Sequence, residues 1–176
     1  MMKHIINLII VLVKIILSRN QINIFTNTIS FWAKIYDSEI GSYNYIGPNV
    51  VINNTHIKNY CSIAPNVVIG GMEHNYSNFS TSTKLYSEQK TRKTIIKDDV
   101  WIGANVFIRM GVTVGKGSII GSNSVVLKDV PPLSIVVGNP GRILKSRFSE
   151  KDKIKKYNSI DFSNNPDLIT LNLNKI

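Results

Sequence analysis

Histidine and cysteine are the side chains of this sequence best suited to catalysis, and both are scarce. The chain has three histidines, at positions 4, 56 and 74, and one cysteine, Cys61. A neutral imidazole, with an ordinary pKa of about 6.5, can accept a proton at cytoplasmic pH, so histidine is a natural general base. His4 lies near the start of the sequence, His56 at an irregular point of a repeat, and His74 in a polar insert. A solvent-exposed histidine without a chemical role is the alternative interpretation for each of them.

The same counts limit metal and thiol chemistry. A single cysteine excludes a disulfide framework and a four-cysteine metal site. A catalytic zinc needs three protein ligands, typically histidines, and only His56 and His74 remain when the terminal His4 is set aside. We therefore expect no metal. Cys61 falls on a small inward position of the repeat described next, where a thiol is normally inert.

An internal repeat of six residues must position these side chains. Aliphatic residues recur at Ile40, Ile46, Ile52, Ile57, Ile63 and Ile69, and then at Ile96, Ile102, Ile108, Val114, Ile120 and Val126. A period of six fits a coil with three flat sides, each side a short strand with its aliphatic residue pointing inward. Smaller residues follow four positions later, at Val50, Cys61, Val67, Val100, Val106, Val112, Ser118 and Ser124. The step from Ile52 to Ile57 is five residues, which predicts a short or bulged side next to His56.

The segments outside the six-residue repeat show how the chain is organised. We expect an N-terminal apolar helical segment over residues 1–36 and a coil over residues 37–132, interrupted by a loop at 71–94. A C-terminal extension follows over residues 133–176, beginning where Pro131 and Pro132 end the ladder. Ser149 is a candidate N-cap for a short helix, and the tail from Asn158 onward is expected to be irregular or to pack on a neighbour. A long irregular insert in a compact repeat domain is usually functional.

The net charge of the chain and its apolar N-terminal segment indicate which binding partners to expect. The net charge of +10 favours anionic partners, but no nucleic-acid-binding signature is present, so no nucleic acid is expected. Residues 5–17 are almost wholly apolar and flanked by Lys3 and Arg19, yet at 13 residues they are too short to span a bilayer. They fit either a helix packed on protein or a membrane-surface anchor. We expect a cytoplasmic protein, at the inner face of the membrane if this segment binds lipid.

Two blocks of the sequence carry a family resemblance. Residues 98–142, DDVWIGANVFIRMGVTVGKGSIIGSNSVVLKDVPPLSIVVGNPGR, resemble the second half of hexapeptide-repeat acyltransferases. Residues 57–86, IKNYCSIAPNVVIGGMEHNYSNFSTSTKLY, are similar to polysaccharide O-acetyltransferases and to the xenobiotic acetyltransferases that modify chloramphenicol and streptogramins. The resemblance implies an all-β fold, a left-handed parallel β-helix with a protruding loop, assembled as a homotrimer. Acetyl-CoA would then lie between neighbouring coils.

The resemblance also implies roles for particular residues. His74 stands where the family carries its general base, and transfer would be direct, without a covalent intermediate on Cys61. The implied CoA contacts are Ala104, Ser122, Leu127, Lys128, Arg142 and Lys145, with the cations on the phosphates. Asn44, Tyr45 and Trp101 are the candidates for the acceptor side of the site.

The acceptor is the open part of the prediction. Where the family loop often reads STHP, this chain has Ser80, Thr81, Ser82 and Thr83, and its tail lacks the tryptophans frequent in the xenobiotic enzymes. These departures favour a sugar hydroxyl of a surface polysaccharide or its precursor over an antibiotic. An antibiotic acetyltransferase, an amino-sugar N-acetyltransferase and a coil without activity that acts as a scaffold stay open as alternatives.

Overall fold

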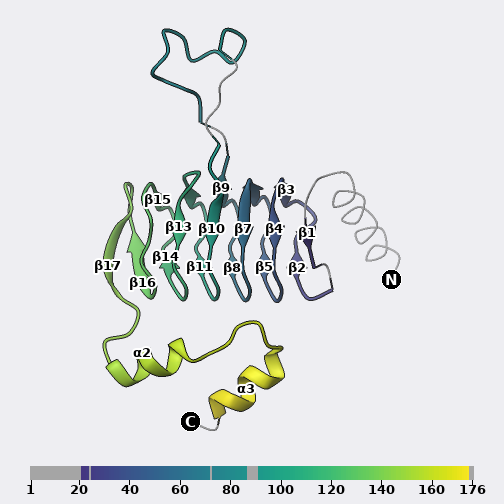
Figure 1. Cartoon of the computed structure of the whole chain (residues 1–176), viewed down its shortest axis with the longest axis vertical. Coiled ribbons are helices and arrows are strands. Elements are labelled where there is room, and N and C mark those ends of the chain that lie inside the picture. Colours follow the sequence, from purple (N-terminus) through teal and green to yellow (C-terminus); the bar gives the residue numbers. More distant parts are fainter. Residues whose placement is uncertain (1–20, 24, 72, 87–90, 175–176) are drawn as a thin grey trace.

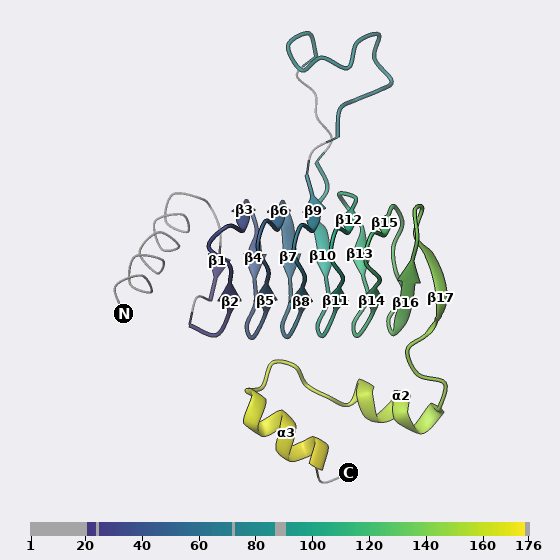
Figure 2. The same ribbon diagram turned by 180° about the vertical axis from the view of Figure 1, so that it is seen from behind.

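The protein is a parallel β-helix with a long loop on one side and two short helices on the other (Figures 1 and 2). The computed structural model describes residues 21–23, 25–71, 73–86 and 91–174. The apolar segment at residues 5–17, which the sequence predicts to be helical, lies outside the described residues.

Three sheets form the flat sides of the coil. Sheet A contains, in spatial order, β1 (Gln21–Ile22), β4 (Glu39–Ile40), β7 (Thr55–Ile57), β10 (Thr94–Ile96) and β13 (Thr113–Val114). Sheet B contains β2 (Thr28–Ile29), β5 (Tyr45–Ile46), β8 (Ser62–Ile63), β11 (Trp101–Ile102), β14 (Ile119–Ile120), β16 (Ser134–Val137) and β17 (Arg142–Ser146). Sheet C contains β3 (Lys34–Tyr36), β6 (Val51–Asn53), β9 (Val68–Gly70), β12 (Phe107–Ile108) and β15 (Val125–Val126).

The six-residue repeat places one inward aliphatic residue on each side of every turn, and the predicted β-helix is confirmed. Apart from β17, which pairs antiparallel with β16, each strand pairs in parallel with the strand one turn away, so that Ile46 lies against Ile63 and Ile102 against Ile120. The inward aliphatic residues from Ile46 to Val114 have no exposed surface, and the smaller inward positions are at most 4% exposed. Every turn therefore buries its apolar interior against the next one, as expected of a solenoid.

The five-residue step beside His56 is a repeated corner. The same step separates Ile35 from Ile40 one turn earlier, and in both turns a residue with positive φ, Asp37 or Asn54, closes the corner. A buried hydroxyl follows each of them: the Ser38 Oγ accepts a hydrogen bond from the Thr55 backbone amide at 3.1 Å. The short side predicted from the sequence is thus real, and it is made by a turn.

The predicted boundaries of the coil were too narrow at both ends. Strands β1, β2 and β3 lie within residues 21–36, where the sequence predicts a helical segment. Their apolar residues Ile22, Ile29 and Ile35 are unevenly spaced, which hid the beat. At the other end, β16 continues sheet B beyond residue 132, because Pro131 and Pro132 occupy the corner before the strand.

The C-terminal tail is more regular than the sequence suggested. Helix α2 (Lys151–Asn158) has Glu150 as its N-cap residue, without a side-chain cap, where we expected Ser149. Helix α3 (Pro166–Asn174) replaces the irregular tail predicted after Asn158.

Both helices pack on the corner between sheets A and B of their own chain. The Tyr157 hydroxyl donates to the Asp99 carboxylate at 2.5 Å, and the Tyr60 hydroxyl donates to the Asn164 carbonyl at 2.6 Å. Leu133, Phe162 and Ile169 are buried together with Tyr157 in a small second core. No helix among the described residues is long and apolar enough to cross a membrane.

Candidate functional site

The loop that carries His74 leaves the coil at one corner, between β9 of sheet C and β10 of sheet A. Gly70 fixes the exit point. Its φ is +73°, and a Cβ at this position would lie 2.1 Å from the backbone oxygen of Asn53 and 2.9 Å from the Thr55 hydroxyl. No other residue fits so close to the preceding turn, so the root of the loop is set by the coil itself.

Polar side chains shape the loop in place of helices or strands. The Asn75 carboxamide oxygen accepts from the backbone amide of Ser77 at 3.0 Å, and the Ser80 hydroxyl accepts from that of Ser82 at 3.1 Å. The Ser82 hydroxyl in turn accepts from the Lys84 amide at 3.2 Å. Such short-range side-chain bonds to the backbone favour turns, which explains how a segment rich in serine, threonine and asparagine holds a shape.

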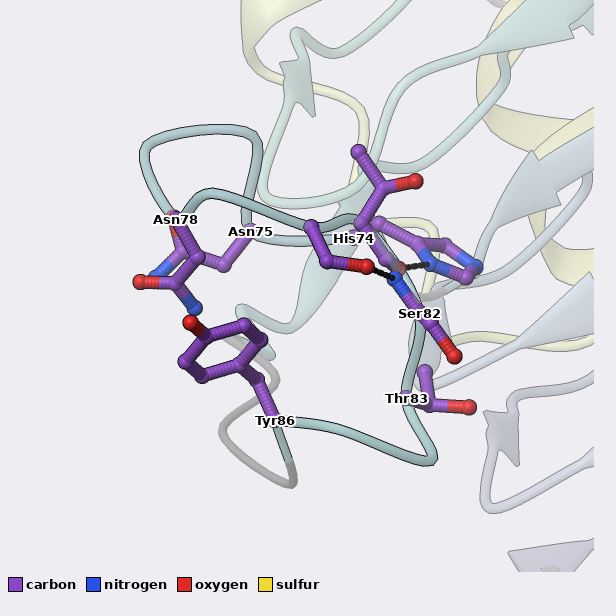
Figure 3. Close-up of a pocket in the computed structure, with 8 residues that line it drawn as sticks. His74, Asn75, Asn78, Ser82, Thr83 and Tyr86 are labelled. Carbon is purple, nitrogen blue, oxygen red and sulfur yellow. Dashed lines mark hydrogen bonds between the residues drawn. The ribbon is translucent and has the colours of Figure 1, made fainter.

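His74 is exposed, and its ring is oriented by the loop. Its Nδ1 lies 2.5 Å from the Thr81 carbonyl oxygen (Figure 3). Because a carbonyl oxygen only accepts hydrogen bonds, Nδ1 must carry the proton, and in the neutral ring the lone pair is then on Nε2. Nε2 of the neutral ring can therefore accept a proton.

Glu73 does not take part in that orientation, although it precedes His74. Its carboxylate forms a bidentate ion pair with Arg109 at the corner after β12, with Nε–Oε1 and Nη2–Oε2 distances of 2.6 and 2.9 Å. The hydrogen bond and the charge of Arg109 hold the pKa of the Glu73 carboxyl below its usual range. This ion pair fastens the root of the loop to the next turn of the coil.

Two hollows adjoin His74. One, inside the loop, is lined by amide and hydroxyl side chains, among them Asn75, Asn78 and Tyr86 (Figure 3). The other is an open groove of about 500 Å³ between the loop and the coil. The groove is lined by Glu73, His74, Asn75, Tyr76, Ser77, Thr91, Arg92, Arg109 and Met110.

The predicted acceptor residues Tyr45 and Trp101 lie elsewhere on the chain. Both are about half exposed on the outer face of sheet B, where each pairs with Ser62 on the strand between them. Sheet B is the side of the coil that does not border the loop's corner, and neither aromatic residue lines the hollows beside His74.

Asn44 corrects the sequence interpretation, because its side chain points into the coil. It is 2% exposed, its Nδ2 donates to the Lys58 carbonyl at 3.0 Å, and its Oδ1 accepts from the Cys61 amide at 2.7 Å. Both ends of the carboxamide thus join two turns, and at 2% exposure the side chain is buried away from an acceptor.

The predicted CoA contacts fall into three groups. Ala104 and Ser122 are on adjacent turns at the corner between sheets B and C, where the Asn123 amide donates to the Ala104 carbonyl at 2.9 Å. Leu127 and Lys128 are exposed at the corner between sheets C and A, one turn beyond Arg109 and Met110. Arg142 and Lys145 are exposed on β17 at the end of the coil. One chain therefore does not bring all of these side chains together around His74.

Cys61 and His56 have structural surroundings. Cys61 is fully buried, burial raises the pKa of its thiol to about 12, and its Sγ lies 3.1 Å from the Lys97 carbonyl. The His56 Nδ1 lies 3.6 Å from the Glu39 carboxylate, while partial burial and the charge of Lys58 lower its pKa. Within the part of the chain that the structure describes, no three acidic, histidine or cysteine side chains form a metal-binding group.

Comparison with known proteins places the chain in a family. Residues 37–71 and 93–128 match the family described as bacterial transferase hexapeptide, six repeats. A hexapeptide-repeat-containing acetyltransferase from Vibrio cholerae is 32% identical, with 70% of this chain and 72% of that chain covered and a TM-score of 0.64. The chain belongs to the hexapeptide-repeat acyltransferase superfamily. The match covers both blocks of the repeat and leaves out the loop between them.

Individual members are similar over parts of their length. The Vibrio cholerae enzyme was also solved with acetyl coenzyme A, at a TM-score of 0.66 and 29% identity, covering 77% of this chain and 75% of that one. A maltose O-acetyltransferase from Clostridium difficile 630 is 27% identical, with coverages of 76% and 70% and a TM-score of 0.61. A chloramphenicol acetyltransferase from Klebsiella aerogenes is 44% identical over 71 residues, which are 40% of this chain and 34% of that protein. The aligned segment thus spans about a third of that curated relative's length.

Reasoning from the sequence missed two features of the site. The Thr81 carbonyl that orients His74 could not be predicted, because every residue has a backbone carbonyl and the residue type does not indicate which one contacts the histidine. Arg109 could have been found: it follows Ile108, which pairs with Ile69, the residue just before the loop root.

Proposed function

We propose that the protein transfers the acetyl group of acetyl-CoA to a hydroxyl of a sugar in a surface polysaccharide or its precursor, with His74 as the general base. The observation that supports this most is the hydrogen bond from His74 Nδ1 to the Thr81 carbonyl, which leaves Nε2 free to accept a proton. Superfamily membership supports acetyl-CoA as the donor, since a solved relative was crystallised with it.

The proposed reaction needs one proton transfer and no covalent enzyme intermediate. As the acceptor oxygen attacks the thioester carbonyl, its proton passes to His74 Nε2. The tetrahedral intermediate then collapses and releases the thiolate of CoA, which takes up the proton from His74. Cys61 is unsuited to form an acyl-enzyme, because its thiol is buried and its pKa is raised to about 12.

The positions of the other predicted residues favour an assembly of several chains. His74 lies at the corner between sheets C and A, whereas Tyr45 and Trp101 lie on sheet B. In a homotrimer with acetyl-CoA between neighbouring coils, one chain supplies His74 and its neighbour supplies the aromatic side chains. Mixing and co-refolding His74→Ala with Trp101→Ala chains then restores up to about a quarter of wild-type activity, the share of interfaces that combine both intact halves. Mixtures that stay inactive contradict a shared site.

A sugar hydroxyl is the proposed acceptor because the surroundings of His74 are polar. The open groove beside His74 presents the carboxamide of Asn75 and the hydroxyls of Ser77 and Thr91. These groups suit a hydroxylated ligand, whose own hydroxyls both donate and accept. The similarity to a chloramphenicol acetyltransferase favours an antibiotic as the second candidate.

The test is thiol release from acetyl-CoA with a panel of acceptors: nucleotide sugars, lipid-linked oligosaccharide fragments, simple glycosides, serine and chloramphenicol. Release specific to a glycan supports the proposal, and release with chloramphenicol alone replaces the polysaccharide with the antibiotic. Absence of thermal stabilisation by CoA, together with no release, identifies a scaffold without activity.

Arg142 has its own test in the proposed CoA site. If the Arg142 side chain binds the 3′-phosphate, the Arg142→Ala substitution weakens binding of CoA but not of dephospho-CoA, because only CoA carries that phosphate. Equal weakening of both ligands assigns Arg142 another role.

A further inference from the structure

The groove between the loop and the coil contains a second arginine, Arg92, whose charge contributes to lowering the pKa of the Glu73 carboxyl. Arg92 lies on the segment that returns from the loop to β10, is exposed and lines the groove together with His74. It makes no hydrogen bond or ion pair with any residue that the structure describes. The other arginine of the groove, Arg109, is engaged by Glu73 through both carboxylate oxygens.

Arg92 is held in place by packing on the coil. A Cβ at Gly111 would lie 2.8 Å from Arg92 Cβ, 3.0 Å from Nε and 3.3 Å from Cζ. The side chain therefore runs along Gly111, on the turn that follows Arg109. The planar guanidinium of an arginine loses less conformational freedom for each hydrogen bond to an anion than the ammonium of a lysine does.

Charge in the groove is unbalanced in favour of an anion. Two arginines face the single carboxylate of Glu73, while Asn75, Ser77 and Thr91 add neutral hydrogen-bonding groups. A volume of about 500 Å³ is within the range of small-molecule sites and accommodates a sugar with a charged substituent.

We propose that Arg92 binds an anionic group of the acceptor, a phosphate or carboxylate carried on or next to the sugar, while His74 meets the hydroxyl. This rests on the proposed function and adds that the acceptor is a charged glycan. A phosphate of CoA is the other source of the same chemistry, since Lys128 lies one turn further along this corner. The groove favours the acceptor because it holds His74 and none of the predicted CoA contacts.

Direct binding tests the site without relying on turnover. The probes are inorganic pyrophosphate and methyl β-D-glucuronide, titrated calorimetrically into wild-type protein, Arg92→Ala, Arg92→Lys and the matched control Lys84→Ala. Lys84 is an exposed loop cation that does not line the groove. We expect Arg92→Ala to weaken binding of at least one probe about tenfold, Arg92→Lys to weaken it less, and Lys84→Ala to change it less than about twofold.

Two further arms separate the possible outcomes. Displacement of pyrophosphate by saturating CoA, or no binding of either probe to wild type, overturns the assignment. For turnover, Arg92→Ala should lower kcat/KM for methyl glucuronide and leave that for methyl glucoside unchanged; an equal loss for both also overturns it. If no acceptor releases thiol from acetyl-CoA, the proposed function fails while the calorimetric result on Arg92 stands.

Discussion

Gly70 is the position where the coil most strictly determines the loop, and replacing it with alanine measures that constraint. The new Cβ would lie 2.1 Å from the backbone oxygen of Asn53, so a backbone segment of the neighbouring turn must shift. A positive φ adds a cost of about 1–2 kcal/mol for any residue with a Cβ. Overpacking against backbone adds about 1–3 kcal/mol, so the total is about 3 kcal/mol.

Gly71→Ala is the matched control. Its φ is +112°, but nothing lies within 4 Å of the Cβ that would be added. Only backbone strain then remains, about 1–2 kcal/mol. Because 1 kcal/mol shifts Tm by about 2–4 °C in a chain of this size, we expect losses of about 6–12 °C for Gly70→Ala and about 3–6 °C for Gly71→Ala.

The assay is thermal unfolding followed by circular dichroism at one protein concentration, since association also shifts Tm. Thiol release is measured on the same samples, because displacement of the loop root also moves His74. Equal melting temperatures for the two variants refute the close approach of Gly70 to Asn53.

Three further changes test other contacts. Tyr157→Phe removes the hydrogen bond to Asp99, which Arg147 also contacts, so we expect a loss of about 1.5 kcal/mol in urea unfolding, while Tyr36→Phe at an exposed site is neutral; equal effects contradict the role of α2 as a docked helix. Glu73→Gln removes a carboxylate whose pKa is lowered from 4.5 by Arg109, so we expect wild type to be more stable than the variant by about 0.5 kcal/mol above pH 4.5. This difference in stability vanishes as the pH falls through the lower pKa of the folded protein. A difference that persists in acid excludes the ion pair as its cause. Cys61, with a pKa raised to about 12, resists iodoacetamide at pH 8 in the native protein and reacts after unfolding in urea; rapid labelling of the native protein contradicts its burial.

Most of the coil could be predicted from the sequence, because the six-residue period of the aliphatic residues is a direct consequence of how the turns pack. Every turn buries one aliphatic residue per side, and the register that joins Ile102 to Ile120 was visible as a spacing of 18 residues. The first turn was not recognised because the step from Ile22 to Ile29 is seven residues, and the six-residue step from Ile29 to Ile35 is followed by a five-residue step. The loop was visible as a break in the six-residue period, and in the structure it joins β9, which ends at Gly70, to β10, which begins at Thr94.

The site was less accessible to such reasoning. Residue type and position singled out His74, but the partner that orients it is a backbone carbonyl. Asn44 was assigned to the acceptor because the family resemblance places acceptor contacts on its turn, whereas it satisfies backbone groups inside the coil. Helix α3 escaped prediction because its few buried residues, such as Ile169, dock on a corner whose position depends on the whole fold.

The most direct test of the account is turnover of the His74→Ala variant beside His56→Ala. Thiol release from acetyl-CoA is measured with the best acceptor of the panel, and CoA affinity is measured by calorimetry on the same proteins. We predict that His74→Ala lowers kcat at least about a hundredfold with CoA affinity unchanged, the scale of a lost general base. His56, which faces Glu39 on sheet A, can be replaced with little effect. Similar turnover in wild type and His74→Ala would contradict the role of His74 and with it the proposed mechanism.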